Sequence, residues 1–79
     1  MATLRLFASV REAAAGERSL TIEGDTVGEV VAAASDKFGE HFAALLPTCK
    51  VWVNGEPAEM ETAITSADEV AILPPVSGG

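Results

Sequence analysis

The final residues of the sequence carry its most distinctive chemical group. The chain ends with two prolines, a valine, a serine and two glycines, the last of which is Gly79. A free carboxylate is a poor electrophile, but an enzyme that converts the Gly79 carboxyl to an acyl-adenylate would make it a good one. Glycine has no β-carbon, so its carbonyl stays open to attack. We therefore expect Gly79 to be the reacting residue, and Gly78 to let the backbone pass through a narrow channel.

The residues around this end are suited to meet a partner protein. Pro74 and Pro75 favour an extended, semi-rigid backbone. Six residues from Pro74 onward, at roughly 3.3 Å each, could reach about 20 Å. Apolar side chains near the root of such a tail could anchor the partner. The expected partner interface is Phe7, Leu73, Pro74, Pro75, Val76 and Ser77. The alternative is that Phe7 and Leu73 belong to the hydrophobic core.

The remaining reactive side chains form no recognisable catalytic or metal-binding motif. His41 has no cysteine or carboxylate cluster at metal-ligand spacing, so we expect it at the surface and predict no metal site. Cys49 has Lys50 as its one basic neighbour, and we expect it to pack and not to act as a nucleophile. Trp52 is expected to lie in the core or to pack half-buried on the sheet, and the alternative is that it stacks on a ligand. Nucleophile elbows and glycine-rich phosphate loops are absent from the sequence. We therefore expect no catalytic site within the chain itself and no bound cofactor.

Composition limits the class of protein and its partners. The 79 residues predict one domain, and an apolar fraction of 48% is enough for one core. Neither a secretory signal nor an apolar run near the ~20 residues of a membrane span is evident. One cysteine fits a reducing cytoplasm. The net charge of −7 disfavours nucleic acid and anionic membranes. It suits a basic protein partner, or it simply keeps the chain soluble.

The first half of the sequence predicts two strands and one main helix. Residues 3–8 and 19–23 alternate between apolar and polar side chains, as paired strands do. Residues 11–15 favour a short helical turn that Gly16 ends. Thr26 precedes Glu29 by three residues, which is a capping-box arrangement. The apolar stripe that follows predicts a helix ending before Gly39, and it consists of Val27, Val30, Val31, Ala34 and Phe38.

The second half predicts the rest of a sheet. Residues 41–46 could add a helical turn, and residues 50–53 form a β-branched and aromatic strand. Asn54-Gly55 predicts a hairpin, and Pro57 restricts the returning strand to an edge. Residues 69–73 form an apolar run without alternation, which predicts a central strand buried on both faces.

This order predicts an α+β fold with one main helix across one face of a mixed sheet of four to five strands. Parallel pairing of the first and last strands in the middle of the sheet gives a β-grasp, the architecture of ubiquitin. A ferredoxin-like fold would need two comparable helices, and only one is convincing here. We expect a β-grasp domain over residues 1–73 and an extended tail over residues 74–79 that ends in Gly-Gly.

Three segments together resemble a known family. The stretch from Leu6 to Gly16, the Val53-Asn54-Gly55 turn and the ending from Asp68 to Gly79 are similar to the small, sulfur-carrying subunits of molybdopterin synthase. These subunits belong to the ubiquitin-like MoaD/ThiS group. The resemblance covers nearly the whole chain, and the ending is its most specific part, since Gly-Gly alone would indicate only a ubiquitin-like carrier.

The resemblance implies a mechanism and a set of partners. A ubiquitin-activating-like enzyme would adenylate Gly79 with ATP and magnesium, and a sulfur donor would convert the adenylate to a thiocarboxylate. The tail would then enter the large subunit of molybdopterin synthase, where its sulfur attacks cyclic pyranopterin monophosphate. The chain would thus be a non-catalytic subunit of a cytoplasmic heterotetramer in molybdenum cofactor biosynthesis.

Other functions remain open at this stage. The chain could carry sulfur for thiamine or cysteine synthesis, or it could be a ubiquitin-like modifier that is joined to lysines through Gly79. It could also be a β-grasp binding module whose tail has no chemical role. The carrier and modifier functions both begin with adenylation of Gly79, so the sequence does not separate them.

Overall fold

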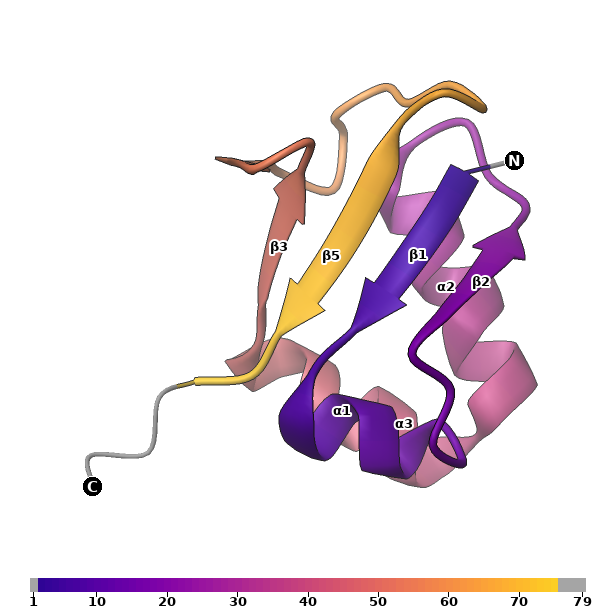
Figure 1. Cartoon of the computed structure of the whole chain (residues 1–79), viewed down its shortest axis with the longest axis vertical. Coiled ribbons are helices and arrows are strands. Elements are labelled where there is room, and N and C mark those ends of the chain that lie inside the picture. Colours follow the sequence, from indigo (N-terminus) through magenta and orange to yellow (C-terminus); the bar gives the residue numbers. More distant parts are fainter. Residues whose placement is uncertain (1, 76–79) are drawn as a thin grey trace.

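The structure is a computed structural model that describes residues 2–75. It consists of one sheet and a layer of helices, as Figure 1 shows. The strands are β1 (Ala2–Leu6), β2 (Ser19–Ile22), β3 (Lys50–Val53), β4 (Glu56–Pro57) and β5 (Glu69–Leu73). The helices are α1 (Ala8–Ala13), α2 (Val27–Phe38) and α3 (Glu40–Leu45), and a 3₁₀ turn, η1 (Leu46–Thr48), follows α3.

The sheet has the predicted mixed topology. Its strand order is β2-β1-β5-β3-β4. The first and last strands pair in parallel, with Leu4 opposite Val70, and the other neighbours are antiparallel. This is the α+β, ubiquitin-like β-grasp that the element order predicted. The central place of β5 brings the end of the strand, and with it Pro74, to the same end of the molecule as α1 (Figure 1).

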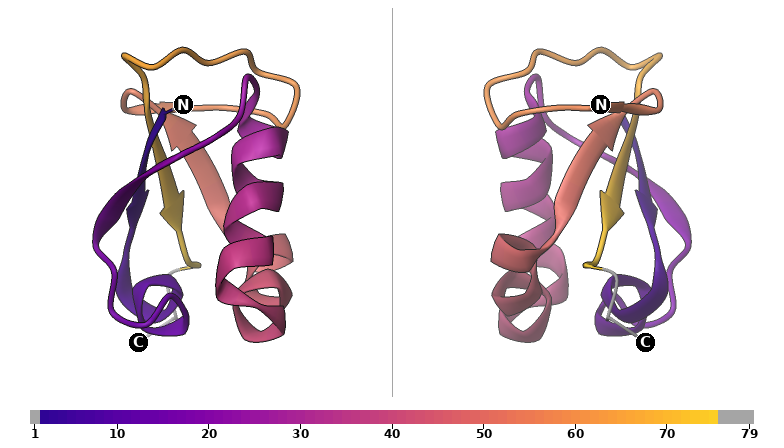
Figure 2. Two further views of the ribbon diagram at one scale, coloured as in Figure 1. Left: turned by 90° about the vertical axis from the view of Figure 1, so that its right-hand side faces the viewer. Right: turned by 90° about the vertical axis from the view of Figure 1, so that its left-hand side faces the viewer.

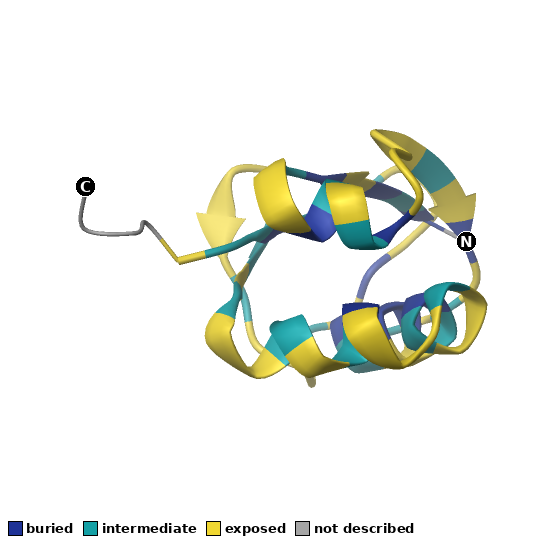
Figure 3. Cartoon of the chain, turned by 90° about the horizontal axis from the view of Figure 1, so that it is seen from below, coloured by how far each residue is buried: buried dark blue, intermediate teal, exposed yellow. Residues whose placement is uncertain are grey.

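The core lies between the sheet and α2, which form the two layers seen edge-on in Figure 2. Figure 3 shows that both layers contain buried residues, coloured dark blue. Helix α3 adds the fully buried ring of Phe42. Among the described residues the buried positions are all apolar: Ala2, Leu4, Leu6, Val10, Ala14, Ile22, Val27, Val30, Val31, Ala34, Phe42, Ile64, Val70 and Ile72. Burial of these side chains drives the packing of a helix whose valines are modest helix formers.

Helix α2 begins and ends where the sequence predicted. The Thr26 hydroxyl oxygen accepts a hydrogen bond from the Glu29 backbone N–H at 3.2 Å. The Glu29 carboxylate reaches back to the N–H of Asp25 at 3.0 Å, one residue before its usual partner in a capping box. Gly39, with φ 93°, follows the last residue of the helix. Such a backbone angle favours glycine.

Two predicted elements differ from the structure. Helix α1 begins at Ala8, earlier than the predicted turn at 11–15, because Val10 is drawn into the core. The prediction that the last strand is buried on both faces was wrong. Val70 and Ile72 are buried, but Glu69, Ala71 and Leu73 on the other face are only half-buried. None of the helices within residues 2–75 covers that face of the sheet (Figure 2), so an apolar run can leave alternate residues accessible.

The predicted Asn54-Gly55 hairpin forms and is tied to the start of β5. Both residues have positive φ, 51° and 84°, as a tight two-residue hairpin turn requires. The Asn54 amide donates to the Asp68 carboxylate at 2.9 Å and accepts from the Glu69 N–H at 3.0 Å. The backbone N–H of Thr65 also donates to Asp68, at 2.7 Å. Asp68 therefore joins the hairpin to the loop that precedes β5.

This junction predicts a specific response to acid. The hydrogen bonds from Asn54 and then from the Thr65 backbone hold the pKa of the Asp68 carboxyl below its ordinary value of 3.8. A depressed pKa stabilises the fold above the unfolded-state value, and the contribution is lost as pH falls through the folded-state value. We expect Asp68→Asn to lower the free energy of unfolding near neutral pH, and the difference from wild type to shrink below about pH 4. Urea unfolding across this pH range measures it. Glu17→Gln, at an exposed carboxylate, is the control and should show no such convergence.

Candidate functional site

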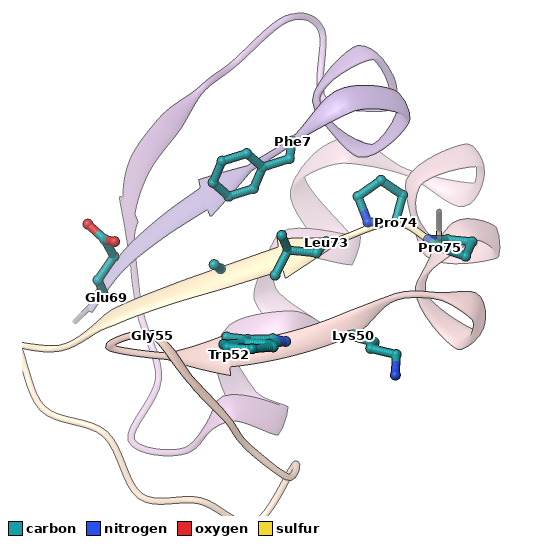
Figure 4. Close-up of a pocket in the computed structure, with 9 residues that line it drawn as sticks. Phe7, Lys50, Trp52, Gly55, Glu69, Leu73, Pro74 and Pro75 are labelled. Carbon is teal, nitrogen blue, oxygen red and sulfur yellow. The ribbon is translucent and has the colours of Figure 1, made fainter. Parts of the chain in front are cut away.

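The uncovered face of the sheet contains an apolar hollow at the root of the C-terminal tail. Its volume is about 400 Å³. We call it the tail-root hollow, and it is lined by Phe7, Lys50, Trp52, Gly55, Glu69, Ala71, Leu73, Pro74 and Pro75. Figure 4 shows the side chains of Phe7, Leu73 and Trp52 on the same side of the sheet, on three neighbouring segments. An accessible apolar concavity of this kind is suited to bind a side chain or segment of a partner.

Strand register creates the hollow. Trp52 lies opposite Ala71 across the β3–β5 ladder, and Lys50 lies opposite Leu73. Side chains of opposed residues share a face of the sheet. Ala71 contributes one methyl group, so it forms a low floor between the larger side chains of Trp52 and Leu73. Phe7 follows β1 in extended conformation, with φ −129° and ψ 148°, and completes the wall on the other side.

Charged groups occupy the two ends of the hollow differently. At the end away from the tail, an Arg5 guanidinium nitrogen lies 3.5 Å from a Glu69 carboxylate oxygen, and both side chains are about half exposed. The Arg5 guanidinium also lies 5.5 Å from the centroid of the Phe7 ring. At the end beside Pro74 and Pro75, the hollow is bordered by exposed Lys50 (Figure 4).

A second hollow lies on the other side of Pro74 and Pro75. It is lined by Ala8, Ser9, Leu45, Thr48, Cys49, Pro74 and Pro75. The Cys49 thiol donates a hydrogen bond to the Leu45 carbonyl at 3.2 Å. Burial raises the pKa of the Cys49 thiol and outweighs the opposing effect of its hydrogen bond with Thr48. A raised pKa makes a thiol a weaker nucleophile near neutral pH, so these surroundings do not activate Cys49.

The structure brings together part of the predicted interface. Phe7, Leu73, Pro74 and Pro75 all line the tail-root hollow, and neither Phe7 nor Leu73 is among the buried core residues. The two remaining interface residues, Val76 and Ser77, lie outside the described part of the chain, and so do the predicted passage residue Gly78 and the predicted reacting residue Gly79.

Trp52 lines the hollow, and the sequence reasoning missed it. Every residue of its strand except Lys50 is apolar, so the pattern did not show which face each one occupies. Lys50 was the available signal. It is two residues from Trp52 and must reach solvent, which places Trp52 on the same accessible face.

Two kinds of feature are absent from the described residues: groups of side chains that could bind a metal ion, and helices that could span a membrane. Within residues 2–75, no group of three or more histidine, cysteine or acidic side chains could hold a metal ion. His41 is exposed, as expected. No helix in this part of the chain has the length and apolar character needed to cross a membrane.

Comparison with known proteins connects the fold and the tail to one family. Residues 4–79 match the ThiS family, so the match includes the Gly-Gly ending. A comparison with curated proteins gave no match.

Solved structures share the fold over the whole chain. Small archaeal modifier protein 1 from Methanosarcina acetivorans is 29% identical, with a TM-score of 0.87 over 99% of this chain and 95% of that one. A chain of the BexX/CysO complex of Amycolatopsis orientalis is 26% identical, with a TM-score of 0.84 over 100% of both chains. The complex of molybdopterin-converting factor subunits 1 and 2 from Helicobacter pylori includes a chain with 24% identity and a TM-score of 0.74, over 99% of this chain and 97% of that one. That last similarity shows the fold alone.

Proposed function

Because this chain belongs to the ThiS family, whose ubiquitin-like fold it shares, we propose that it carries sulfur on the carboxyl group of Gly79. The observation that carries the proposal is the position of the tail-root hollow, which borders Pro74 and Pro75 just before the Gly-Gly ending. A partner held there lies beside the point from which the tail continues. The folded domain then serves to present Gly79 to enzymes that act on it.

The proposed chemistry has three steps. A carboxylate oxygen of Gly79 attacks the α-phosphorus of ATP, pyrophosphate leaves, and magnesium on the activating enzyme neutralises the phosphate charge. Sulfide (HS⁻) delivered by a donor protein then attacks the acyl carbon and displaces AMP, which leaves with one of the two carboxyl oxygens, so the carboxylate becomes a thiocarboxylate. Finally the thiocarboxylate sulfur attacks an acceptor to form a thioester, and water hydrolyses its acyl carbon–sulfur bond, which leaves the sulfur on the acceptor and restores the Gly79 carboxylate. All catalytic groups come from the partners.

We further propose that the acceptor is cyclic pyranopterin monophosphate and that the partner is the large subunit of molybdopterin synthase. The Leu6–Gly16 and Asp68–Gly79 segments that resemble the small subunits support this choice. The shared fold of the Helicobacter pylori molybdopterin-converting factor is consistent with it. The activating enzyme and the large subunit would dock in turn over Phe7, Trp52 and Leu73.

Two similarities favour second candidates. The likeness to the CysO chain favours a carrier that serves another sulfur pathway, such as cysteine formation, and thiamine synthesis belongs to the same class. The likeness to an archaeal modifier protein favours conjugation of Gly79 to lysines. Each of these functions would begin with adenylation of Gly79 by an enzyme that docks at the tail-root hollow. They would differ in the acceptor that reacts with the activated Gly79.

Intact mass spectrometry tests the proposal. We expect incubation with the activating enzyme, ATP, magnesium and a sulfur donor to produce a mass gain equal to the exchange of one oxygen for one sulfur. Omission of ATP is the control. Lysine-linked conjugates in a cell extract, without that exchange, would support the modifier function instead. Addition of the large subunit and cyclic pyranopterin monophosphate should then restore the original mass, and failure to do so would redirect the search to another acceptor.

A further inference from the structure

Lys50 and Arg5 are the two positively charged residues at the tail-root hollow, and their surroundings differ. Within residues 2–75, Arg5 forms an ion pair with Glu69, whereas Lys50 forms no ion pair. Its neighbours in the tail-root hollow at this end are the apolar side chains of Leu73, Pro74 and Pro75. Among the described residues, the hollow therefore has an oppositely charged pair at its far end and a positive charge without an ion-pair partner at the end beside Pro74 and Pro75.

Docking of a partner changes the free energy of the charged Lys50 side chain, because it alters how much water surrounds the ammonium group. A partner that fills the hollow removes water from the apolar side chains around Lys50 and from part of its ammonium group. A charge that loses water without gaining a partner costs free energy, whereas an opposing carboxylate offsets the loss. Arg5 and Glu69 lie 3.5 Å apart and offset each other's charge, so the far end of the hollow does not require a charged group on the partner.

We propose that Lys50 pairs with a carboxylate of the activating enzyme and thereby fixes the direction in which the enzyme docks. This inference rests on the proposed function and adds the chemistry of the partner surface: an apolar side chain for the hollow, and an acidic residue beside it on the side of the tail. Charges at an interface set orientation and register. Beside Lys50 the partner would need an acidic residue. The chain as a whole, with its net charge of −7, would instead attract a basic surface.

A charge reversal with a matched control tests the pairing. Lys50→Glu and Lys37→Glu both change the net charge from −7 to −9, because each replaces one positive charge with one negative charge. Lys37 is exposed near the end of α2, in the helical layer, and is not part of the hollow. We expect Lys50→Glu to weaken binding to the enzyme that loads the wild-type chain by at least about tenfold. Lys37→Glu should change the dissociation constant less than about threefold, and Lys50→Arg should retain binding.

Carbodiimide cross-linking provides a second measurement that does not depend on affinity. This reagent joins an amine directly to a carboxylate in contact with it. In the complex with the activating enzyme, we expect peptide mapping to find Lys50 linked to an aspartate or glutamate of the enzyme. No such link is expected from Lys37.

The outcomes separate this inference from the proposed function. If the wild-type chain acquires sulfur but Lys50→Glu binds as well as Lys37→Glu, the pairing is wrong and the carrier function stands. Equal weakening by both variants would show that only net charge matters, which also overturns the pairing. If the wild-type chain never acquires sulfur, the proposed function fails first. Circular dichroism melting of each variant shows whether a loss of binding reflects a loss of fold.

Discussion

A chain that lacks Gly79, or that carries one extra residue after it, is expected to acquire no sulfur while its melting temperature changes by less than about 3 °C. The reason is chemical, because adenylation needs a terminal carboxyl at the position that the activating enzyme holds. A misplacement of even ~1 Å at a reacting group can cost about a hundredfold in rate. Stability should be preserved because the buried apolar residues of the described chain all lie between Ala2 and Ile72.

The measurement is intact mass after incubation with activating enzyme, ATP and sulfur donor, paired with thermal unfolding. Gly78→Trp is an informative companion variant. Its carboxyl end is unchanged, so it should still react, but more slowly, because a large side chain obstructs passage through a narrow channel. Untrimmed, extended protein that acquires sulfur at the wild-type rate would refute the role of the terminal carboxyl. A large drop in melting temperature would contradict a purely chemical role for the tail.

Trp52→Ala is expected to weaken binding to the activating enzyme by roughly a hundredfold, with a loss of stability of only about 1 kcal/mol. Trp52 forms one wall of the tail-root hollow and is half-buried there, opposite the small Ala71. Large aromatic side chains at the centre of an interface contribute disproportionately to affinity. Removal of the indole would leave the hollow without this wall and would remove part of the contact area.

Titration calorimetry of each variant with the enzyme measures this effect. Met60→Ala is the matched control, because Met60 is a large apolar side chain that is 48% exposed and does not line the tail-root hollow. It should bind nearly as well as wild type. If both variants lose affinity equally, general surface hydrophobicity would explain the binding. If Trp52→Ala retains full affinity, the partner docks elsewhere.

Several parts of the fold could be predicted from the sequence because their signals are local. The capping residue Thr26, the apolar stripe that follows it and Gly39 define helix α2 without reference to any other element. Asn54-Gly55 likewise specifies a turn whose backbone angles few other residue pairs adopt comfortably. The element order around these two features was sufficient to predict parallel pairing of β1 with β5.

Signals that depend on neighbouring segments were less reliable. The sequence predicted that the first helix begins at residue 11, but α1 begins at Ala8. The burial of Val10 in the core depends on other segments and is not visible in the local pattern. The apolar run of β5 was taken to be buried on both faces, because such a run is ambiguous until the layers are known. Sequence also left open whether Phe7 and Leu73 belong to the core.

By itself, the sequence determined the order of elements, the bounds of the main helix and the hairpin, and the chemistry available at Gly79. These features depend on backbone preference, on capping and on the identity of one terminal group. Only the tertiary structure decided that Phe7, Trp52 and Leu73 meet in one hollow at the root of the tail. The three residues are far apart in sequence, and the face each one occupies is set by strand register and by helices that cover only one side of the sheet.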